Sequence, residues 1–77
     1  MQTNNANVVV DLKQVISRKN GDELESELGS IRGVSRARVS QRARRLVLVD
    51  YDPETVNSQK ILGTVVRHGF DARLIGM

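Results

Sequence analysis

The chain has 77 residues, of which 39% are apolar and 27% charged, and its formal net charge is +3. This length allows one small domain, and the balance of apolar and charged residues is that of a folded domain, not a disordered tail. The absence of cysteine excludes disulfide bonds, thiolate metal sites and cysteine-based catalysis. We therefore expect one domain over residues 1–77, with its core at about residues 8–75.

No targeting or membrane-spanning segment is predicted. The longest uninterrupted apolar runs, Val8–Val10 and Leu46–Val49, are far shorter than the roughly 20 residues that a membrane span needs. The polar segment Met1–Asn7 lacks the basic and then apolar pattern of a signal peptide. The sequence therefore predicts a cytoplasmic protein.

A strand and a helix are expected in the first part of the chain. Asn7–Lys13 alternates apolar and other residues, which predicts a strand. Asn20 followed by Glu23 resembles a capping box, so the helix should begin at Asn20 with Asp22 and Glu23 in its first turn, and end at Gly33. Its buried stripe should consist of apolar residues at helical spacing, Leu24, Leu28 and Ile31.

Two further strands should form a hairpin. Val34–Ser40 and Leu46–Tyr51 both alternate, and the polar, basic segment Gln41–Arg45 between them suits a loop. Pro53 stops the second strand because proline has no amide hydrogen for the ladder.

A second helix and a last strand complete the pattern. The helix should begin at Asn57 or Ser58 and end at Gly69, followed by a strand over Phe70–Ile75. Its buried stripe should be formed by four aliphatic residues, Ile61, Leu62, Val65 and Val66. The order βαββαβ predicts an α+β, ferredoxin-like sandwich, a four-stranded antiparallel sheet with two helices on one face.

Four short segments, in this order and spacing, resemble the heavy-metal-associated domain. This family includes copper chaperones, the mercury-binding periplasmic protein and the N-terminal domains of metal-transporting P-type ATPases. The resemblance covers about residues 8–75. The segments that carry it are Ile31–Val34, Ala37–Val39, Val47–Pro53 and His68–Ala72.

The metal-binding motif of that family is missing here. The resemblance implies a Cys-x-x-Cys pair after the first strand, and counting back from Gly33 places Ser17 and Asn20 at its two positions, with Arg18 and Lys19 between them. Soft metal ions require thiolate donors, which a hydroxyl and an amide do not replace. We therefore expect no cofactor and no soft-metal binding. Ser17 and Asn20 should instead cap the helix; binding of an anion is the alternative.

His68 is the only histidine, so one chain cannot supply a site of several histidines. We expect it to lie at the C-terminus of the second helix, where a cation is favourable. The alternative is a weak metal site that His68 forms with Asp71, Met77 or a second subunit. Phe70, which the resemblance places near the metal loop, is expected to fill the core.

Six arginines lie between positions 32 and 45 with no acid among them. Arg42, Arg44 and Arg45 are expected to be solvated in the hairpin loop, while Arg36 and Arg38 should face away from the helices. By the same alternation, the uncovered sheet face should carry an aliphatic strip and charged residues: Val9, Leu46, Leu48, Ile75, Asp11, Asp50, Asp71 and Arg73. This face is predicted either to form a weak two-fold homodimer, in which arginines pair with aspartates across the axis, or to be an ordinary exposed sheet.

No pairing of a nucleophile with a base and no nucleotide-binding glycine motif occurs, so an enzyme is not expected. The basic segment Arg32–Arg45 favours at most weak nucleic-acid binding, since the sheet lacks aromatics for base stacking.

Protein interaction or regulation near metal transport is the function that we expect. In the family, the metal loop and the adjacent helix faces dock onto a partner's matching domain. The resemblance thus implies a partner such as a metal transporter or its soluble domain, met through the loop, the acidic helix face and Phe70. The residues of this expected docking area are Ser17, Arg18, Lys19, Asn20, Glu23, Glu27 and Phe70.

Overall fold

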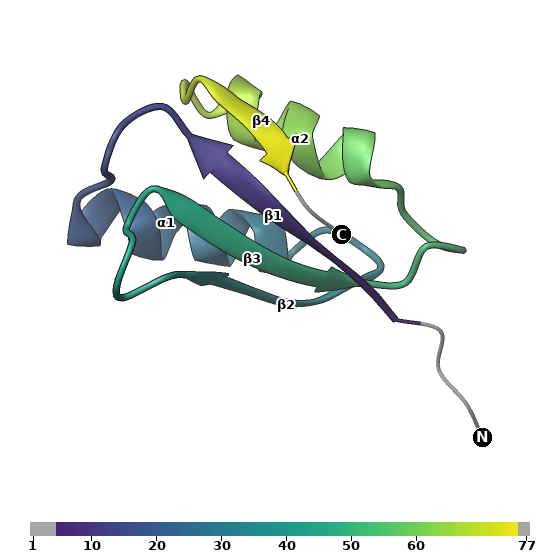
Figure 1. The fold of residues 1–77 in the computed structure, drawn as a ribbon. Coiled ribbons are helices and arrows are strands. Elements are labelled where there is room, and N and C mark those ends of the chain that lie inside the picture. The colour runs from purple at the N-terminus through teal and green to yellow at the C-terminus, as the bar shows by residue number, and fades with distance from the viewer. Residues whose placement is uncertain (1–4, 76–77) are drawn as a thin grey trace.

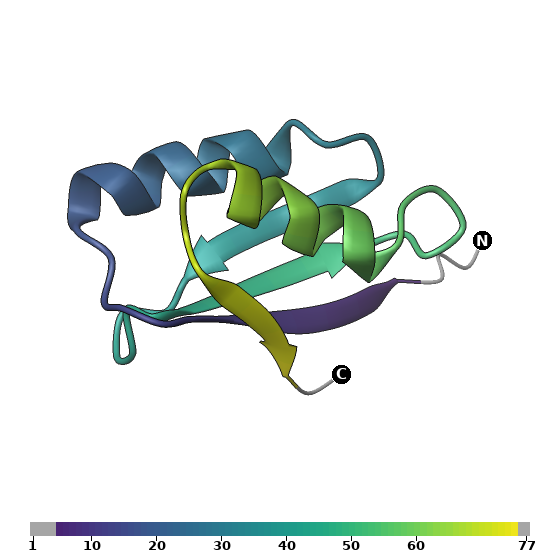
Figure 2. The same cartoon turned by 90° about the horizontal axis from the view of Figure 1, so that it is seen from above.

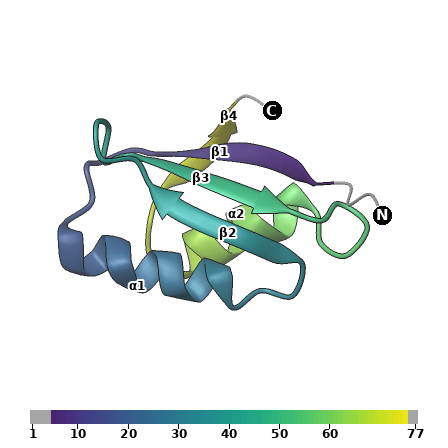
Figure 3. The same cartoon turned by 90° about the horizontal axis from the view of Figure 1, so that it is seen from below.

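The computed structural model describes residues 5–75. Its elements are β1 (Ala6–Leu12), α1 (Arg18–Gly29), β2 (Val34–Val39), β3 (Leu46–Tyr51), α2 (Ser58–Arg67) and β4 (Ala72–Ile75) (Figure 1). The strands form one antiparallel sheet in the order β2-β3-β1-β4. Figures 2 and 3 show both helices on the same side of this sheet. The predicted ferredoxin-like βαββαβ fold is confirmed.

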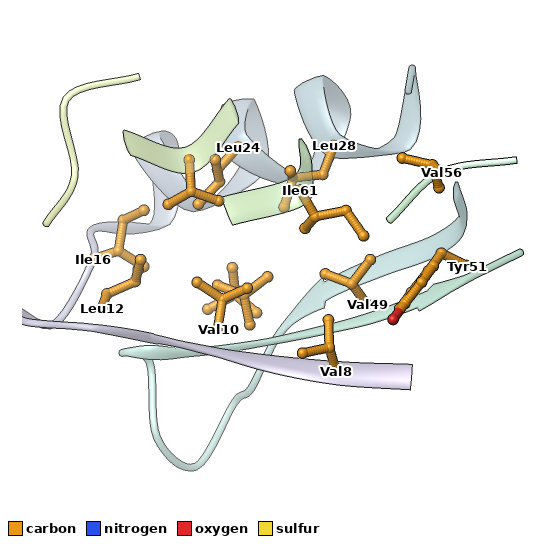
Figure 4. Packing of buried hydrophobic residues seen from close by; sticks show 13 residues of the cluster. Val8, Val10, Leu12, Ile16, Leu24, Leu28, Val49, Tyr51, Val56 and Ile61 are labelled. Carbon is orange, nitrogen blue, oxygen red and sulfur yellow. The ribbon is translucent and has the colours of Figure 1, made fainter. Parts of the chain in front are cut away.

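The core lies between the sheet and the helices. Alternation turns every second side chain of β1 and β3 toward α1 and α2, whose apolar stripes meet them (Figure 4). Burying one such side chain contributes roughly 1.5–3 kcal/mol, so this layer supplies most of the driving force for folding. The least exposed of these side chains are Val8, Val10, Leu12, Leu24, Leu28, Val47, Val49, Ile61 and Val65. Within the described residues, no helix is long and apolar enough to cross a membrane.

Helix α1 starts earlier than predicted. Ser17 is its N-cap, and the Ser17 hydroxyl accepts a hydrogen bond from the Asn20 amide at 3.2 Å. Asn20 therefore lies inside the helix, and the prediction of a start at Asn20 is wrong. The first turn contains Arg18 and Lys19 and no acidic residue, so the predicted acidic first turn is wrong as well.

The end of α1 also differs from the prediction. The helix ends at Gly29 with Ser30 as its C-cap, so Ile31 packs against the core from the following turn. Gly33 has φ +102°, a left-handed conformation that disfavours other residues. A Cβ atom there would lie 2.8 Å from the Val56 side chain. Gly33 is thus required by the turn into β2, not by the end of α1.

The second half of the chain matches the prediction at the start of α2 and differs from it at three points. Helix α2 has Asn57 as its N-cap, and the Asn57 Oδ1 accepts from the Lys60 amide at 2.8 Å. Val66 is 49% exposed, so it does not belong to the buried stripe. Strand β4 begins at Ala72, because Phe70 and Asp71 still belong to the connection that leaves α2. Arg67 rather than Gly69 is the last residue of α2.

Candidate functional site

The connection from β1 to α1 forms a small hollow with the connection from α2 to β4. Its volume is about 270 Å³. Three of the residues expected at the docking area, Ser17, Asn20 and Phe70, line it together with Val15. Arg18 and Lys19 are exposed in the adjoining first helical turn. We call these six residues the loop surface: Val15, Ser17, Arg18, Lys19, Asn20 and Phe70.

Val15 is the residue of the loop surface that sequence reasoning missed. Its side chain is 72% exposed, the largest exposure of any big apolar side chain within residues 5–75. Phe70 is half-buried and packs against the core from the same area. The signal in the sequence was an apolar residue in a connection that should otherwise be polar. A single exposed apolar side chain is common on protein surfaces, so Val15 contributes to a contact site only together with Phe70 and the neighbouring cations.

The local charge of the loop surface is positive. Arg18 and Lys19 add two cations at the end of α1 where the helix dipole is also positive, and no acid in the first turn offsets them. The side-chain oxygen of Ser17 already accepts the Asn20 amide. The surface therefore disfavours a metal cation and favours an acidic group.

Arg44 holds the loop surface in place from the hairpin. Its Nε donates to the Ile16 carbonyl at 3.2 Å and its Nη2 donates to the Ser17 carbonyl at 3.3 Å. In return, the Ile16 amide donates to the Arg44 carbonyl at 3.1 Å. Arg44 is half-buried, so the expectation that it is merely solvated is wrong. A Cβ at position 21 would lie 2.8 Å from Nη2, so Gly21 leaves room for this guanidinium.

The glutamates of the expected docking area lie apart from the loop surface. Glu23 and Glu27 are exposed on α1, and neither lines the hollow at the loop surface. The Glu27 Oε1 lies 3.4 Å from the Nε2 of His68, the C-cap of α2. Glu27 and His68 line a groove of about 850 Å³ between the end of α1 and helix α2.

His68 and Asp71, its expected metal partner, line different hollows, and Met77, the other expected partner, lies outside the described residues. Asp71 lines the hollow at the loop surface, which shares no lining residue with the groove that contains His68. Within residues 5–75 there is no group of three or more histidine, aspartate or glutamate side chains placed to hold a metal ion.

The sheet face opposite the helices carries the predicted aliphatic strip. Pairing of the strands places Arg38, Leu48, Val9 and Ile75 in one row across the sheet. Leu48 is 48% exposed and Ile75 36% exposed, while Val9 and Leu46 are half-buried. Arg36 lies one row away, opposite Asp50. We call this surface the open face.

Asp11 lies on the open face but is buried, which sequence reasoning did not foresee. Only 7% of the residue is exposed. The Nε atom of Arg45 lies 3.3 Å from its Oδ1, and the Nε atom of Arg73 lies 3.4 Å from its Oδ2. The contact to Oδ1 is an ion pair without hydrogen-bond alignment, so that oxygen has no hydrogen-bond donor among residues 5–75. Arg45 is thus an ion-pair partner as well as a loop residue, and Arg42 is exposed in the hairpin.

No protein-family model and no curated protein sequence matches the chain. Solved structures do. Oxidized MerP from Ralstonia metallidurans has a TM-score of 0.83, with 15% identity over 95% of this chain and 100% of that chain. The CopZ metallochaperone has a TM-score of 0.80, with 22% identity over 88% of this chain and 100% of that chain.

A third similar structure is the N-terminal domain of a potential copper-translocating P-type ATPase from Bacillus subtilis in the Cu(I)-loaded state. Its TM-score is 0.80, with 24% identity over 91% of this chain and 86% of that chain. At these identities the likeness establishes the fold. The fold implied by the resemblance to the heavy-metal-associated domain is thereby confirmed.

Proposed function

We propose that the chain is a non-enzymatic, heavy-metal-associated-like module of the cytoplasm that does not bind soft metal ions and docks onto another protein through the loop surface. The observation that carries the proposal is the state of Ser17. Its hydroxyl caps α1, and its carbonyl accepts from Arg44. The position that the resemblance assigns to a metal ligand is thus used to hold the loop.

The charge of the loop surface supports the loss of metal binding. A soft cation there would face Arg18, Lys19 and the positive end of the α1 dipole, with no thiolate to offset them. The test is an amide-shift titration of the chain with Cu(I), Zn(II) and Hg(II) under reducing conditions. We expect no saturable shifts at micromolar ion. Stoichiometric shifts at Ser17–Asn20 would contradict the proposal, and shifts centred on His68 and Asp71 would favour the alternative of a weak metal site.

The same surface suits a protein partner. It combines an exposed apolar side chain, Val15, with two cations on a framework that Arg44 fixes. Preorganised surfaces of this kind lose little conformational freedom on binding. The partner that we propose is the soluble domain of a metal transporter carrying an acidic contact surface. The similarity of fold to the N-terminal domain of a P-type ATPase supports this choice.

A titration with such a domain tests the docking. The isotope-labelled chain is mixed with the purified N-terminal domain of a metal-transporting P-type ATPase from the same organism. We expect amide shifts at Val15, Arg18 and Lys19, and their loss in the double variant Arg18→Glu, Lys19→Glu. Lys60→Glu is the matched control, because Lys60 is an exposed cation in the first turn of α2. Binding that survives the double reversal, or is lost in the control as well, would contradict docking at the loop surface.

Nucleic-acid binding through Arg32–Arg45 is the competing function. The structure offers few rings for base stacking, since Tyr51 is only 5% exposed and Phe70 is half-buried. We expect single-stranded DNA to shift no defined set of amides at physiological salt. Saturable shifts confined to the Arg36–Arg45 segment would favour the competing function instead.

A further inference from the structure

The open face joins an apolar row to two pairs of arginines. In the row that crosses the whole sheet, Leu48, Val9 and Ile75 lie side by side, and Arg38 ends it at β2. A hollow of about 460 Å³ lies at this end, lined by Arg36, Arg38, Leu48 and Val9 among others. No element within residues 5–75 covers this side of the sheet, as Figures 2 and 3 show.

The second pair of arginines is built around Asp11. Arg45 precedes β3 and Arg73 lies on β4, and both contact the buried Asp11 carboxylate through Nε. Their side chains nevertheless remain 56% and 77% exposed. Asp11 thus fixes two guanidinium groups that still face solvent. Both arginines line a second hollow, of about 330 Å³, to which Lys13 adds a third cation.

The balance of charge on the open face is positive. Asp11 is already paired with Arg45 and Arg73 of its own chain. Asp50, opposite Arg36, is the other acid that the strands place on this face. Arg36 and Arg38 are exposed, and no ion pair joins either of them to an acid within residues 5–75. The face therefore offers four arginines against two aspartates.

We infer that the open face binds an acidic amphipathic segment of a partner protein. Apolar side chains of the segment would cover Leu48, Val9 and Ile75, and its carboxylates would meet the arginines on either side. Guanidinium groups suit carboxylates because they offer paired donors in one plane. Strands are about 4.8 Å apart, so the sheet is about 14 Å wide from β2 to β4. One helix, about 10–12 Å across, fits this width.

This occupant fits better than the two alternatives. A nucleic acid would find arginines but no ring on the strand rows of the face, where Val9, Leu48 and Ile75 are aliphatic. A second copy of the chain would bring its own excess of arginines against this one. The inference does not depend on the proposed function, because the open face and the loop surface share no residue.

A pair of synthetic helical peptides tests the inference. One carries a leucine stripe flanked by glutamates; in the other, glutamine replaces every glutamate. We expect the acidic peptide to shift the amides of Val9, Leu48 and Ile75 saturably. The glutamine peptide should bind at least about fivefold more weakly, because two or more ion pairs are lost. Added salt should weaken the acidic peptide.

Two variants and one control locate the contact. Arg73→Gln should weaken the acidic peptide by up to about fivefold, since it removes a single exposed ion pair, and Arg38→Glu should weaken it more, since it also sets a like charge against the peptide. Arg42→Glu should leave its affinity unchanged, because Arg42 is exposed but lines neither hollow of the open face. Both hollows are tested, so a loss caused by misfolding in one variant does not decide the result.

Three outcomes would overturn the inference. Equal affinity for the two peptides would show that carboxylates are not recognised. Tighter binding of single-stranded DNA at the same amides would identify a nucleic-acid surface. Shifts of these amides on raising the concentration of the chain alone, with none added by the peptide, would identify a surface for self-association. None of these outcomes bears on the loop surface, which the ATPase-domain titration tests separately.

Discussion

At the scale of single residues, Arg44 connects two parts of the chain that are remote in sequence. Its guanidinium reaches the Ile16 and Ser17 carbonyls, which are 28 and 27 residues earlier. Ile16 itself is buried in the core. Without the guanidinium, the Ile16 carbonyl would have to find water beside its own packed side chain, whereas the Ser17 carbonyl would keep the Gly21 amide, which donates to it at 2.8 Å. Arg44 therefore stabilises the loop surface as well as the fold.

Replacing Arg44 tests this role. We expect Arg44→Ala to lower the free energy of unfolding by about 1–3 kcal/mol, the usual range for hydrogen bonds from a charged donor. Arg42→Ala is the matched control, and it should change stability by less than about 0.5 kcal/mol because Arg42 is exposed. Urea unfolding of both variants gives the comparison. Equal effects would show that the Arg44 contacts are not stabilising.

Variants at Ser17 and Asn20 distinguish a residue that caps α1 from a residue that lies inside it. Ser17→Ala removes the oxygen that accepts the Asn20 amide and should cost about 1 kcal/mol. Asn20→Ala keeps that amide and replaces a poor helix former inside α1, so it should be neutral or stabilising by about 0.5 kcal/mol. Thermal unfolding of the two variants measures both changes. A larger loss at Asn20 than at Ser17 would contradict the observed cap.

At the scale of whole elements, the edge of the sheet at β2 is closed by a side chain of α1. The Glu25 Oε2 accepts a hydrogen bond from the Val39 amide at 2.7 Å. Because β2 is an edge strand, this amide has no neighbouring strand to pair with. An unpaired edge invites pairing with another chain. Glu25 thus fixes α1 against β2 and blocks one donor of that edge.

Hydrogen exchange measures this contact directly. In Glu25→Ala, the Val39 amide should exchange faster, and stability should fall by about 1 kcal/mol. Glu23→Ala is the control, since Glu23 is an exposed acid on the same helix. The Val10 amide, in the middle of the sheet, reports any change in global stability. If Val39 exchange is accelerated only as much as Val10 exchange, the Glu25 contact has no local effect.

The order of the elements could be predicted because it depends on local patterns. Alternation in β1 and β3 and the spacing of Leu24 and Leu28 identify strands, helix and buried faces without knowledge of distant contacts. The start of α1 could not be predicted, because Ser17 and Asn20 are both good capping residues. The structure starts the helix at Ser17, where the carbonyl is held by Arg44 from the hairpin.

Prediction from the sequence is limited in the same way at the candidate site, because distant contacts decide which residues are buried. Alternation assigns Asp11 to the uncovered side of the sheet, where an aspartate is normally solvated. Its burial depends on Arg45 and on Arg73, which lies 62 residues later in the chain. Likewise, the helical spacing of Val66 predicts burial, and only the packing of α2 leaves it 49% exposed. These features arise from how the elements meet, so a single sequence does not reveal them.

At the scale of the whole molecule, the charge is distributed in a way that bears on self-association. The two-fold dimer predicted from the sequence requires arginines of one copy to pair with Asp11, Asp50 and Asp71 of the other. Asp11 is buried under its own arginines, and Asp71 lines the hollow at the loop surface. Of the three acids, Asp50 is therefore the one left on the strand rows for a second copy. Two open faces would meet with an excess of positive charge.

The excess of positive charge on the open face determines whether added salt strengthens or weakens self-association. If two chains associate through the open face, contact between Leu48 and Ile75 of the two copies must overcome repulsion between arginines. Salt shortens the screening length from about 10 Å at 0.1 M to about 3 Å at 1 M, which weakens that repulsion. Any dimer formed through this face should therefore be weak and should become tighter as salt is raised. Binding of an acidic segment to the same face should respond in the opposite direction.

Sedimentation equilibrium over a wide range of protein concentration, at low and at high salt, decides the matter. Leu48→Ser should weaken the association at both salt concentrations, because it removes apolar area from the centre of the open face. Val66→Ser is the matched control, since Val66 is 49% exposed and Leu48 48% exposed, but Val66 lies on α2 away from the sheet. A dimer that weakens with added salt would instead support the prediction from the sequence that arginines pair with aspartates across the two-fold axis. A chain that stays monomeric under every condition would show that the open face does not bind a second copy.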